Sequence, residues 1–358
     1  MRMWFRPVKG IAFCIVAAFF GSQAMAQVQV KRSFPSAKRI SAFDNTTFCT
    51  AFLSDGSLLT IRDIPIVDLR DVDKIAFNPT GSSLALMRGK KPVSIYSFRD
   101  RNKKLFELKE QRKSKELKGR KNLNFFVPGP VGAELMKDAS KGDIVPVAMC
   151  YGADARNFLV SNSLGEIIVY DTKAYLPQAY IQGKAVATAI TMSPNNYFIA
   201  AGTGKNIDIW NFQTKELRTS LPMPAEVTEL VFSADASQMA VVTADKRLTI
   251  FDTKTWDKVD IFDKIGGTLT SPSFHPDGKY ISVVKDGNAI VIMNLKNSVP
   301  EQTLDENPGG VTGSRFFVNK QTSDVFMLSN RAKGLVFWDA NGLNPFFGKL
   351  MSKEVDAK

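Results

Sequence analysis

The chain has 358 residues, a formal net charge of +12, one histidine and three cysteines. A closed zinc site usually takes four Cys or His ligands, so this composition disfavours a structural zinc protein. The positive charge is local, because residues 99–121 hold eleven Lys or Arg against four Asp or Glu. The composition therefore predicts one strongly basic segment and not a basic surface all round.

The first 26 residues have the pattern of a cleaved export signal. Residues 1–10 contain three Lys or Arg, residues 11–20 are an unbroken apolar run, and Ala24-Met25-Ala26 forms a small-x-small cleavage site. An apolar run this short disfavours a membrane anchor, which needs about 20 residues. We therefore expect residues 1–26 to be removed and the remainder to be exported, most simply to a bacterial periplasm. An extracellular or outer-membrane-associated location is the alternative.

Most of the remaining chain repeats one pattern. Each unit has a β-rich run, a polar turn, a second β-rich run, a turn with Gly or charged residues, and a third β-rich run. The third run ends in an aromatic residue or Met, followed by Asp, Asn or Ser. Successive ends at Asp171, Asn211, Asp252 and Asn294 are 40, 41 and 42 residues apart. The clearest units are residues 75–98, 147–172, 190–212, 230–253 and 272–295. A period of roughly 40–45 residues with several strands per unit is typical of β-propeller blades.

Two further units bring the total to seven. Residues 58–64 match residues 247–253, and Trp338-Asp339 ends a unit that begins near Arg315. The sequence therefore predicts an all-β fold, a single seven-bladed propeller with four-stranded blades.

The propeller is expected to cover residues 27–351, with a flexible tail at 352–358. The first unit supplies only three strands, so it lacks either its innermost or its outermost strand. Residues 344–350 form a further β-rich run. We expect this run to join the first unit and close the terminal blade, which would remove an open sheet edge.

The repeat is interrupted by a basic insertion at residues 109–143. Long insertions in compact domains are usually functional or lack fixed structure. One interpretation is a solvated loop; another is a docking element for an anionic partner, such as an acidic protein, lipopolysaccharide or phospholipid head groups. Nucleic acid is disfavoured, because no aromatic residue that could stack on bases precedes Phe125. The candidate partner-binding residues are Lys109, Arg112, Lys113, Lys115, Lys118, Arg120 and Lys121.

The unit ends resemble those of WD40-type propellers. The run FHPDGKYI at residues 274–281 also resembles the proline-aspartate-glycine repeats of periplasmic propellers such as the Tol-system translocation protein. The resemblance covers nearly the whole mature chain. It implies that the insertion joins the first and second strands of a unit and projects from the face opposite the His-Pro-Asp-Gly turn. Of the unit ends only Trp338-Asp339 is a Trp-Asp pair, and the family's Gly-His dipeptides are absent, so its histidine-containing network is not expected here.

The sequence offers little for catalysis. His275 occupies a turn position that other units fill with Asn78, Ser193 or Ser233, which predicts a turn residue and not a general base. A Ser-His-Asp triad would need His275, and no nucleophile-elbow pattern occurs. Residues 201–206 lack the Lys-Ser/Thr ending of a phosphate loop and are predicted to form a hairpin turn. Most Asp and Glu fall at equivalent turns, so we predict no catalytic, cofactor-binding or metal-binding residues.

Two cysteines, Cys49 and Cys150, remain after the predicted cleavage site. They fall in the first and third units, which are not adjacent. A disulfide needs Cα atoms within about 7 Å. We therefore expect two buried free thiols.

The expected function is that of a non-enzymatic exported scaffold, which binds envelope proteins in an assembly such as a secretion or outer-membrane machine. One alternative is an enzyme, or a binder of small ligands or glycans, that uses the central tunnel. Another is a protein that binds an anionic surface through the basic insertion. The fold alone does not choose among these classes.

Overall fold

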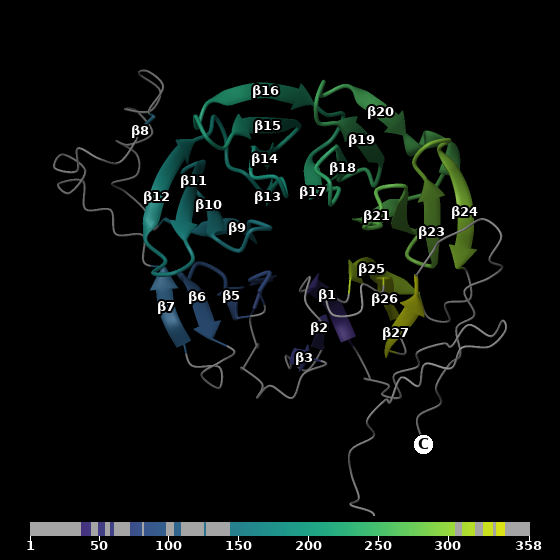
Figure 1. Cartoon of the computed structure of the whole chain (residues 1–358), viewed down its shortest axis with the longest axis horizontal. Helices are drawn as coiled ribbons and strands as arrows, with labels where there is room; N and C mark the ends of the chain where they lie inside the picture. Colours follow the sequence, from purple (N-terminus) through teal and green to yellow (C-terminus); the bar gives the residue numbers. More distant parts are fainter. Residues whose placement is uncertain are drawn as a thin grey trace, which may run out of the picture.

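The computed structural model describes residues 37–43, 49–53, 58–60, 72–80, 82–97, 104–108, 125–126, 144–304, 310–318, 325–331 and 334–340. Within these residues the strands form seven sheets arranged in a ring (Figure 1). We number the sheets 1 to 7 in chain order.

Sheet 1 contains β1 (Ala37–Phe43), β2 (Cys49–Leu53) and β3 (Leu58–Thr60). Sheet 2 contains β4 (Lys74–Phe77), β5 (Ser83–Met87), β6 (Val93–Ser97) and β7 (Lys104–Leu108). Sheet 3 contains β8 (Phe125–Phe126), β9 (Pro146–Tyr151), β10 (Asn157–Asn162), β11 (Glu166–Asp171) and β12 (Pro177–Gln182). Sheet 4 contains β13 (Ala189–Met192), β14 (Phe198–Thr203), β15 (Asn206–Asn211) and β16 (Leu217–Pro222).

Sheet 5 contains β17 (Val227–Phe232), β18 (Gln238–Thr243), β19 (Leu248–Asp252) and β20 (Lys258–Ile261), and a short 3-10 helix (Phe262–Ile265) follows it. Sheet 6 contains β21 (Leu269–Phe274), β22 (Tyr280–Lys285), β23 (Ala289–Asn294) and β24 (Val299–Leu304). Sheet 7 contains β25 (Val311–Val318), β26 (Val325–Arg331) and β27 (Gly334–Asp339).

Each sheet is built outward from the centre of the ring. Consecutive strands pair antiparallel in chain order, and β8 alone among the described strands pairs parallel, on the outer side of β12. The first strands of neighbouring sheets contact one another in the series β4, β9, β13, β17, β21 and β25. Strand β1 contacts both β4 and β25, so the first sheet closes the ring between the second and the last.

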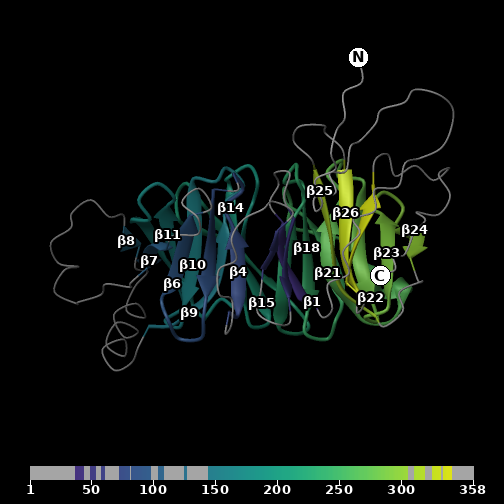
Figure 2. The same cartoon turned by 90° about the horizontal axis from the view of Figure 1, so that it is seen from below.

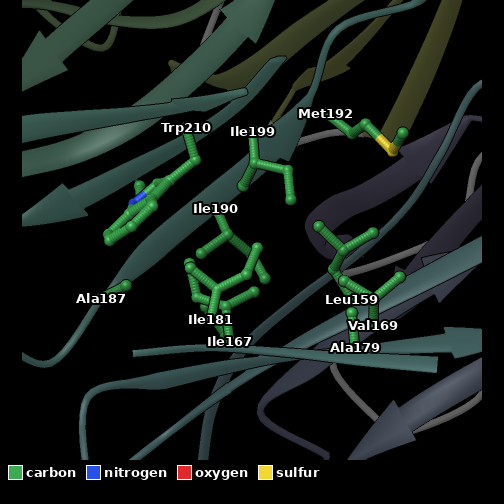
Figure 3. Packing of buried hydrophobic residues seen from close by; sticks show 12 residues of the cluster. Leu159, Ile167, Val169, Ala179, Ile181, Ala187, Ile190, Met192, Ile199 and Trp210 are labelled. Carbon is green, nitrogen blue, oxygen red and sulfur yellow. The ribbon is translucent and has the colours of Figure 1, made fainter. Parts of the chain in front are cut away.

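The core lies between the sheets, which explains why the middle strands are continuous apolar runs. Every residue of β10 is buried, because neighbouring sheets cover both of its sides. In the outermost strand β16, by contrast, buried or half-buried residues alternate with exposed ones along Leu217–Leu221. Figure 3 shows the packing between sheets 3 and 4, where Ile167 and Ile181 lie opposite Ile190 and Trp210. Truncating a fully buried aliphatic side chain in such an interface costs about 2–5 kcal/mol.

The turn after the first strand of a sheet has the same structure in five sheets. Its first residue donates a backbone hydrogen bond to the carbonyl oxygen five residues later. In four of these turns, an Asp or Asn two residues into the turn accepts a hydrogen bond from the backbone amide two residues further on. This local bonding is the reason why Asp and Asn favour turns. The five turns begin at Asn78, Gly152, Ser193, Ser233 and His275.

The strands run between two faces of the ring, seen from the side in Figure 2. We call the face with the turns just described, and with the turns between the third and fourth strands, face A. Face B carries the turns between the second and third strands and the connections from one sheet to the next. The insertion at residues 109–143 starts after β7 and ends before β9, so it leaves and re-enters the ring on face B. It links the outermost strand of one sheet to the innermost strand of the next.

The all-β, propeller-like class predicted from the repeat is confirmed. Over the described residues four sheets have four strands, one has five, and sheets 1 and 7 have three each. Because β1 lies innermost, the strand that the first unit lacks belongs at its outer edge. The predicted signal (residues 1–26), the closing run (344–350) and the tail (352–358) lie outside the described residues. Within the described part of the chain, no helix has the length and apolar character needed to cross a membrane.

Candidate functional site

The carboxylates at the unit ends belong to turns on face A. Asp171 Oδ1 accepts hydrogen bonds from the backbone amides of Lys173 and Ala174, at 3.0 and 2.8 Å. Asp252 accepts the equivalent pair in sheet 5, at 2.7 and 3.0 Å. Asn211 does the same in sheet 4 with its amide oxygen. An amide replaces the carboxylate without loss of the turn, so these side chains cap turns and are not placed for acid–base chemistry.

His275 is a buried turn residue, as its position in the repeat predicts. Its side chain is 4% exposed, and Nε2 lies 3.2 Å from the carbonyl oxygen of Ala340 in sheet 7. Its ring packs edge-on against Phe316 and Tyr280. Nδ1 lies 2.8 Å from Asp277 in its own turn. These contacts tie sheet 6 to sheet 7 and enclose the imidazole.

Cys150 on β9 is a free thiol. Burial raises its pKa to about 12, and a hydrogen bond with the backbone of Met192 only partly offsets this. A thiol with so high a pKa is a weak nucleophile at neutral pH. Cys49 lies on β2 of sheet 1, two sheets away from β9, and its side chain is outside the described part. No described residue therefore offers an activated cysteine.

Metal binding gains no support from the described residues. They contain no group of three or more His, Cys, Asp or Glu that could hold a metal ion.

The innermost strands carry charged side chains that sequence reasoning missed. Lys74 Nζ lies 2.9 Å from the carbonyl oxygen of Val147 and 3.2 Å from that of Thr188. The lysine therefore reaches from sheet 2 across sheet 3 to the start of sheet 4. On the other side of the ring, Arg315 bonds to the carbonyl oxygen of Pro272 at 2.6 Å and pairs with Glu229 at 3.9 Å. That pair spans sheets 5, 6 and 7.

A signal for part of this arrangement was present in the sequence. Lys74 and Glu229 each stand four residues before the first turn residue of their unit, Asn78 and Ser233, where Gly152 and Ser193 are preceded by Ala148 and Ala189. The repeat thus shows that charged residues stand at an equivalent position of the first strand. It does not show which charged side chains contact each other. Because Lys74 and Arg315 both bond to backbone carbonyls of neighbouring sheets, they brace the innermost part of the ring.

Aromatic side chains in the turns on face A join neighbouring sheets. Tyr175, with φ of 52°, lies 3.1 Å from the hydroxyl of Ser83 in sheet 2 and 2.9 Å from the hydroxyl of Tyr151. Trp256 occupies the same turn position in sheet 5, with φ of 64°, and packs edge-on against Phe198 in sheet 4 at 5.2 Å. Both side chains are buried. They form part of the ring and not a binding surface.

The predicted partner-binding residues of the insertion lie outside the described residues. These are Lys109, Arg112, Lys113, Lys115, Lys118, Arg120 and Lys121. The face from which the insertion emerges is described, however, and it is basic. Exposed lysines in the turns and connections of sheets 2, 3 and 4 there are Lys90, Lys91, Lys184 and Lys205. We call these four residues the cationic patch. Sequence reasoning missed them because they are scattered over three units.

No family model matches the chain. Part of the chain is 24% identical over 147 residues to echinoderm microtubule-associated protein-like 2 of Rattus norvegicus, which covers 40% of this chain and 22% of that protein. Another alignment is 29% identical over 132 residues to the periodic tryptophan protein 2 homolog of Dictyostelium discoideum, and covers 31% of this chain and 14% of that protein.

The aligned stretches thus span less than a quarter of the length of either relative. Both relatives are WD40-repeat proteins, a class that is typically non-enzymatic and that binds other proteins. Their likeness supports a protein-interaction scaffold. Together with the ring of antiparallel sheets, it is consistent with a divergent WD40-type propeller.

Proposed function

We propose that this propeller is an exported scaffold that binds partner proteins in a cell-envelope assembly. The binding role rests on a contrast between polar side chains that are hydrogen-bonded within the ring and lysines that are exposed. The acids and amides at the unit ends, and His275, are engaged in the turns of the ring, while the lysines of the cationic patch remain exposed. Exposed turns on a rigid ring suit recognition.

The export part of the proposal rests on residues 1–26, whose charged, apolar and small-residue segments follow the order of a signal peptide. An exported propeller with exposed turns on a rigid ring is suited to holding envelope components together. The basic insertion at 109–143 begins and ends on face B, beside the cationic patch. Its lysines and arginines would then contribute to docking.

The test is crosslinking in cells followed by affinity purification and mass spectrometry. The intact protein is compared with a variant that lacks residues 109–121. We expect specific envelope proteins with the intact form and loss of some of them with the variant. Recovery of no protein above background with either form would overturn the scaffold proposal.

The location is tested separately by fractionation and N-terminal sequencing of the mature protein. We expect the mature protein to begin at Gln27 and to be released with the periplasmic fraction. An uncleaved chain in the cytoplasmic fraction would overturn the proposed export.

A further inference from the structure

We propose that the cationic patch binds an acidic polypeptide segment of the partner. This inference deepens the proposed function, on which it rests, because it assigns the docking face and the chemistry of what docks there. The patch consists of Lys90 and Lys91 in the turn between β5 and β6, Lys184 in the connection from β12 to β13, and Lys205 in the turn between β14 and β15. All four side chains are exposed.

In the described residues around the patch, basic side chains outnumber acidic ones. Two exposed carboxylates lie in the described turns and connections of sheets 2 to 4 on face B: Asp73, whose Oδ2 accepts a hydrogen bond from the backbone amide of Gly89, and Glu226, in the connection from β16 to β17. Glu166, at the start of β11, is 4% exposed and hydrogen-bonds to Asn162 at 2.8 Å. Arg88, two residues before Lys90, adds a further cation and lies 6.0 Å from the ring of Tyr96. The local charge is therefore positive, with five cations against two exposed acids among the described residues.

The four lysines have no partner among the described residues for their ammonium groups. Their side chains are exposed to solvent, so they are accessible to an anionic partner. Several like charges at the turns of adjacent sheets also repel one another mildly when no anion is bound. An acidic ligand relieves that repulsion, and this favours binding.

The excess of positive charge is larger here than on the neighbouring part of face B. Beyond Glu226, the described turns of sheets 5 and 6 on face B hold Lys246, Arg247 and Lys285 against Asp245 and Asp286. Arg247 pairs with Asp245 at 3.5 Å. The Oδ1 atom of Asp286 accepts a hydrogen bond from the backbone amide of Thr268 at 2.7 Å.

Over its described turns, which leave out residues 98–103 of sheet 2, face A of sheets 2 to 4 is balanced. Its described turns hold Arg156, Lys173 and Lys215 against Asp154, Asp171 and Glu216. The patch is thus not a consequence of the net charge of the chain. It is a concentration of lysines over three adjacent sheets on one face.

The basic insertion enters and leaves the ring within this same region, between sheets 2 and 3. Residues 109–121 contain seven Lys or Arg against two Glu. Whatever path these residues take, both of their flanking strands end on face B beside the patch. The sequence and the described surface therefore place positive charge in one region.

The surface favours a polypeptide over a membrane or nucleic acid. Stable membrane attachment takes an apolar element together with basic charge, and base recognition takes exposed aromatic rings. The large exposed apolar side chains among the described residues all lie elsewhere, on face A or on outermost strands; they are Leu105, Leu176, Tyr197, Val259 and Val299. Lysines spread along an arc match an extended segment rich in Asp and Glu, which meets several cations in turn.

The test measures binding of a fluorescent peptide of about twelve residues rich in Glu to the purified full chain, by anisotropy. A peptide with Gln in place of Glu is the probe control. We expect binding to the acidic peptide alone, weakening steeply with salt, because the contacts are solvent-exposed charges screened over about 10 Å at 0.1 M ionic strength. Binding of the protein to vesicles of phosphatidylcholine with phosphatidylglycerol is measured in parallel.

The decisive variant carries Lys90→Glu, Lys91→Glu, Lys184→Glu and Lys205→Glu. Its matched control carries Lys173→Glu, Lys254→Glu, Lys279→Glu and Lys296→Glu, four exposed lysines on face A, so that both variants have the same net charge. We expect the patch variant to bind at least about tenfold more weakly and the control to change by less than about threefold at low salt. If the patch variant fails to fold, Lys→Gln changes at the same four positions replace it.

Equal weakening in both variants would overturn the inference, because net charge alone would then explain binding. Binding to the vesicles but not to the peptide would overturn it as well and would assign the face to an anionic membrane. Failure here is distinguishable from failure of the scaffold. If the crosslinked partners persist while the peptide does not bind, the docking face is wrong and the scaffold stands.

Discussion

Arg315 on β25 and Glu229 on β17 form an ion pair at 3.9 Å although sheet 6 lies between their strands. The guanidinium reaches past the innermost strand of sheet 6, where it also bonds to the carbonyl oxygen of Pro272. Glu229 in turn accepts a hydrogen bond from the backbone amide of Ser271. Arg315 therefore connects three consecutive sheets at the centre of the ring.

This connection predicts unequal effects of removing its two partners. Arg315→Ala should lower the free energy of unfolding by about 1–3 kcal/mol, because a charge-assisted hydrogen bond to a backbone carbonyl is lost. Glu229→Gln should cost less than about 1 kcal/mol, since the pair is about a third exposed and screened by solvent. Urea denaturation of both variants and of the double variant measures these losses in the free energy of unfolding. The larger effect at Glu229, or no effect at Arg315, would contradict this account.

The hydroxyl of Tyr175 is predicted to hold sheets 2 and 3 together. Tyr175→Phe keeps the buried ring but removes its bonds with Ser83 and Tyr151. We expect a loss of about 1–2 kcal/mol. Tyr197→Phe is the matched control, because Tyr197 is 55% exposed, and it should change stability by less than about 0.5 kcal/mol. Thermal and urea unfolding of both proteins make the comparison, and equal stability of the two variants would refute the role given to Tyr175.

Cys150 and Tyr151 predict a loss of stability at alkaline pH. Burial raises the pKa of the Cys150 thiol from 9.0 to about 12, and it raises the pKa of Tyr151 well above 10.0. In both cases the unfolded chain releases its proton at lower pH than the folded chain. The stabilisation is therefore complete below pH 9 and is lost as pH rises from 9 toward 12. For Cys150 the slope approaches about 1.4 kcal/mol per pH unit.

Cys150→Ala should flatten this alkaline slope without changing the pH profile below 8. Urea titrations between pH 7 and 11 measure the slope. In the folded wild type at pH 7.5, iodoacetamide should label Cys150 slowly, and addition of urea should make labelling fast. Peptide mapping by mass spectrometry follows this one site. Rapid labelling of the folded protein, or parallel slopes for both proteins, would show that the thiol is not buried as described.

Completion of the terminal blade by residues 344–350 remains a prediction from the sequence. Sheet 1 has three strands over the described residues, and its outer edge is where a fourth strand would pair. Deletion of residues 345–350 should lower the melting temperature of the whole ring in one transition, because sheet 1 contacts both sheet 2 and sheet 7 and a weakened sheet 1 would destabilise both neighbours. Deletion of residues 352–358 is the control and should have little effect. An unchanged melting temperature after the first deletion would exclude a closing strand there.

The repeat predicted the fold because its signals are local. The turns that begin at Ser193, Ser233 and His275 are each held by hydrogen bonds within six residues, so side chain and partner are read together in the sequence. The same locality explains why Asp171 and Asn211 were recognised as structural. His275 was placed in its turn for this reason, although its contact with Ala340 could not be foreseen.

The sequence by itself determined the strands, the turns and the basic character of the insertion. Only the tertiary structure decided which distant charges share a region. Lys90 and Lys205 stand in different units, and each is one exposed lysine in an ordinary turn, yet ring formation brings their turns to the same face of neighbouring sheets. Likewise, nothing near Arg315 in the chain indicates Glu229. The sequence predicts the blades because their turns are held by local hydrogen bonds. Contacts between blades depend on the closed ring and form only when it does.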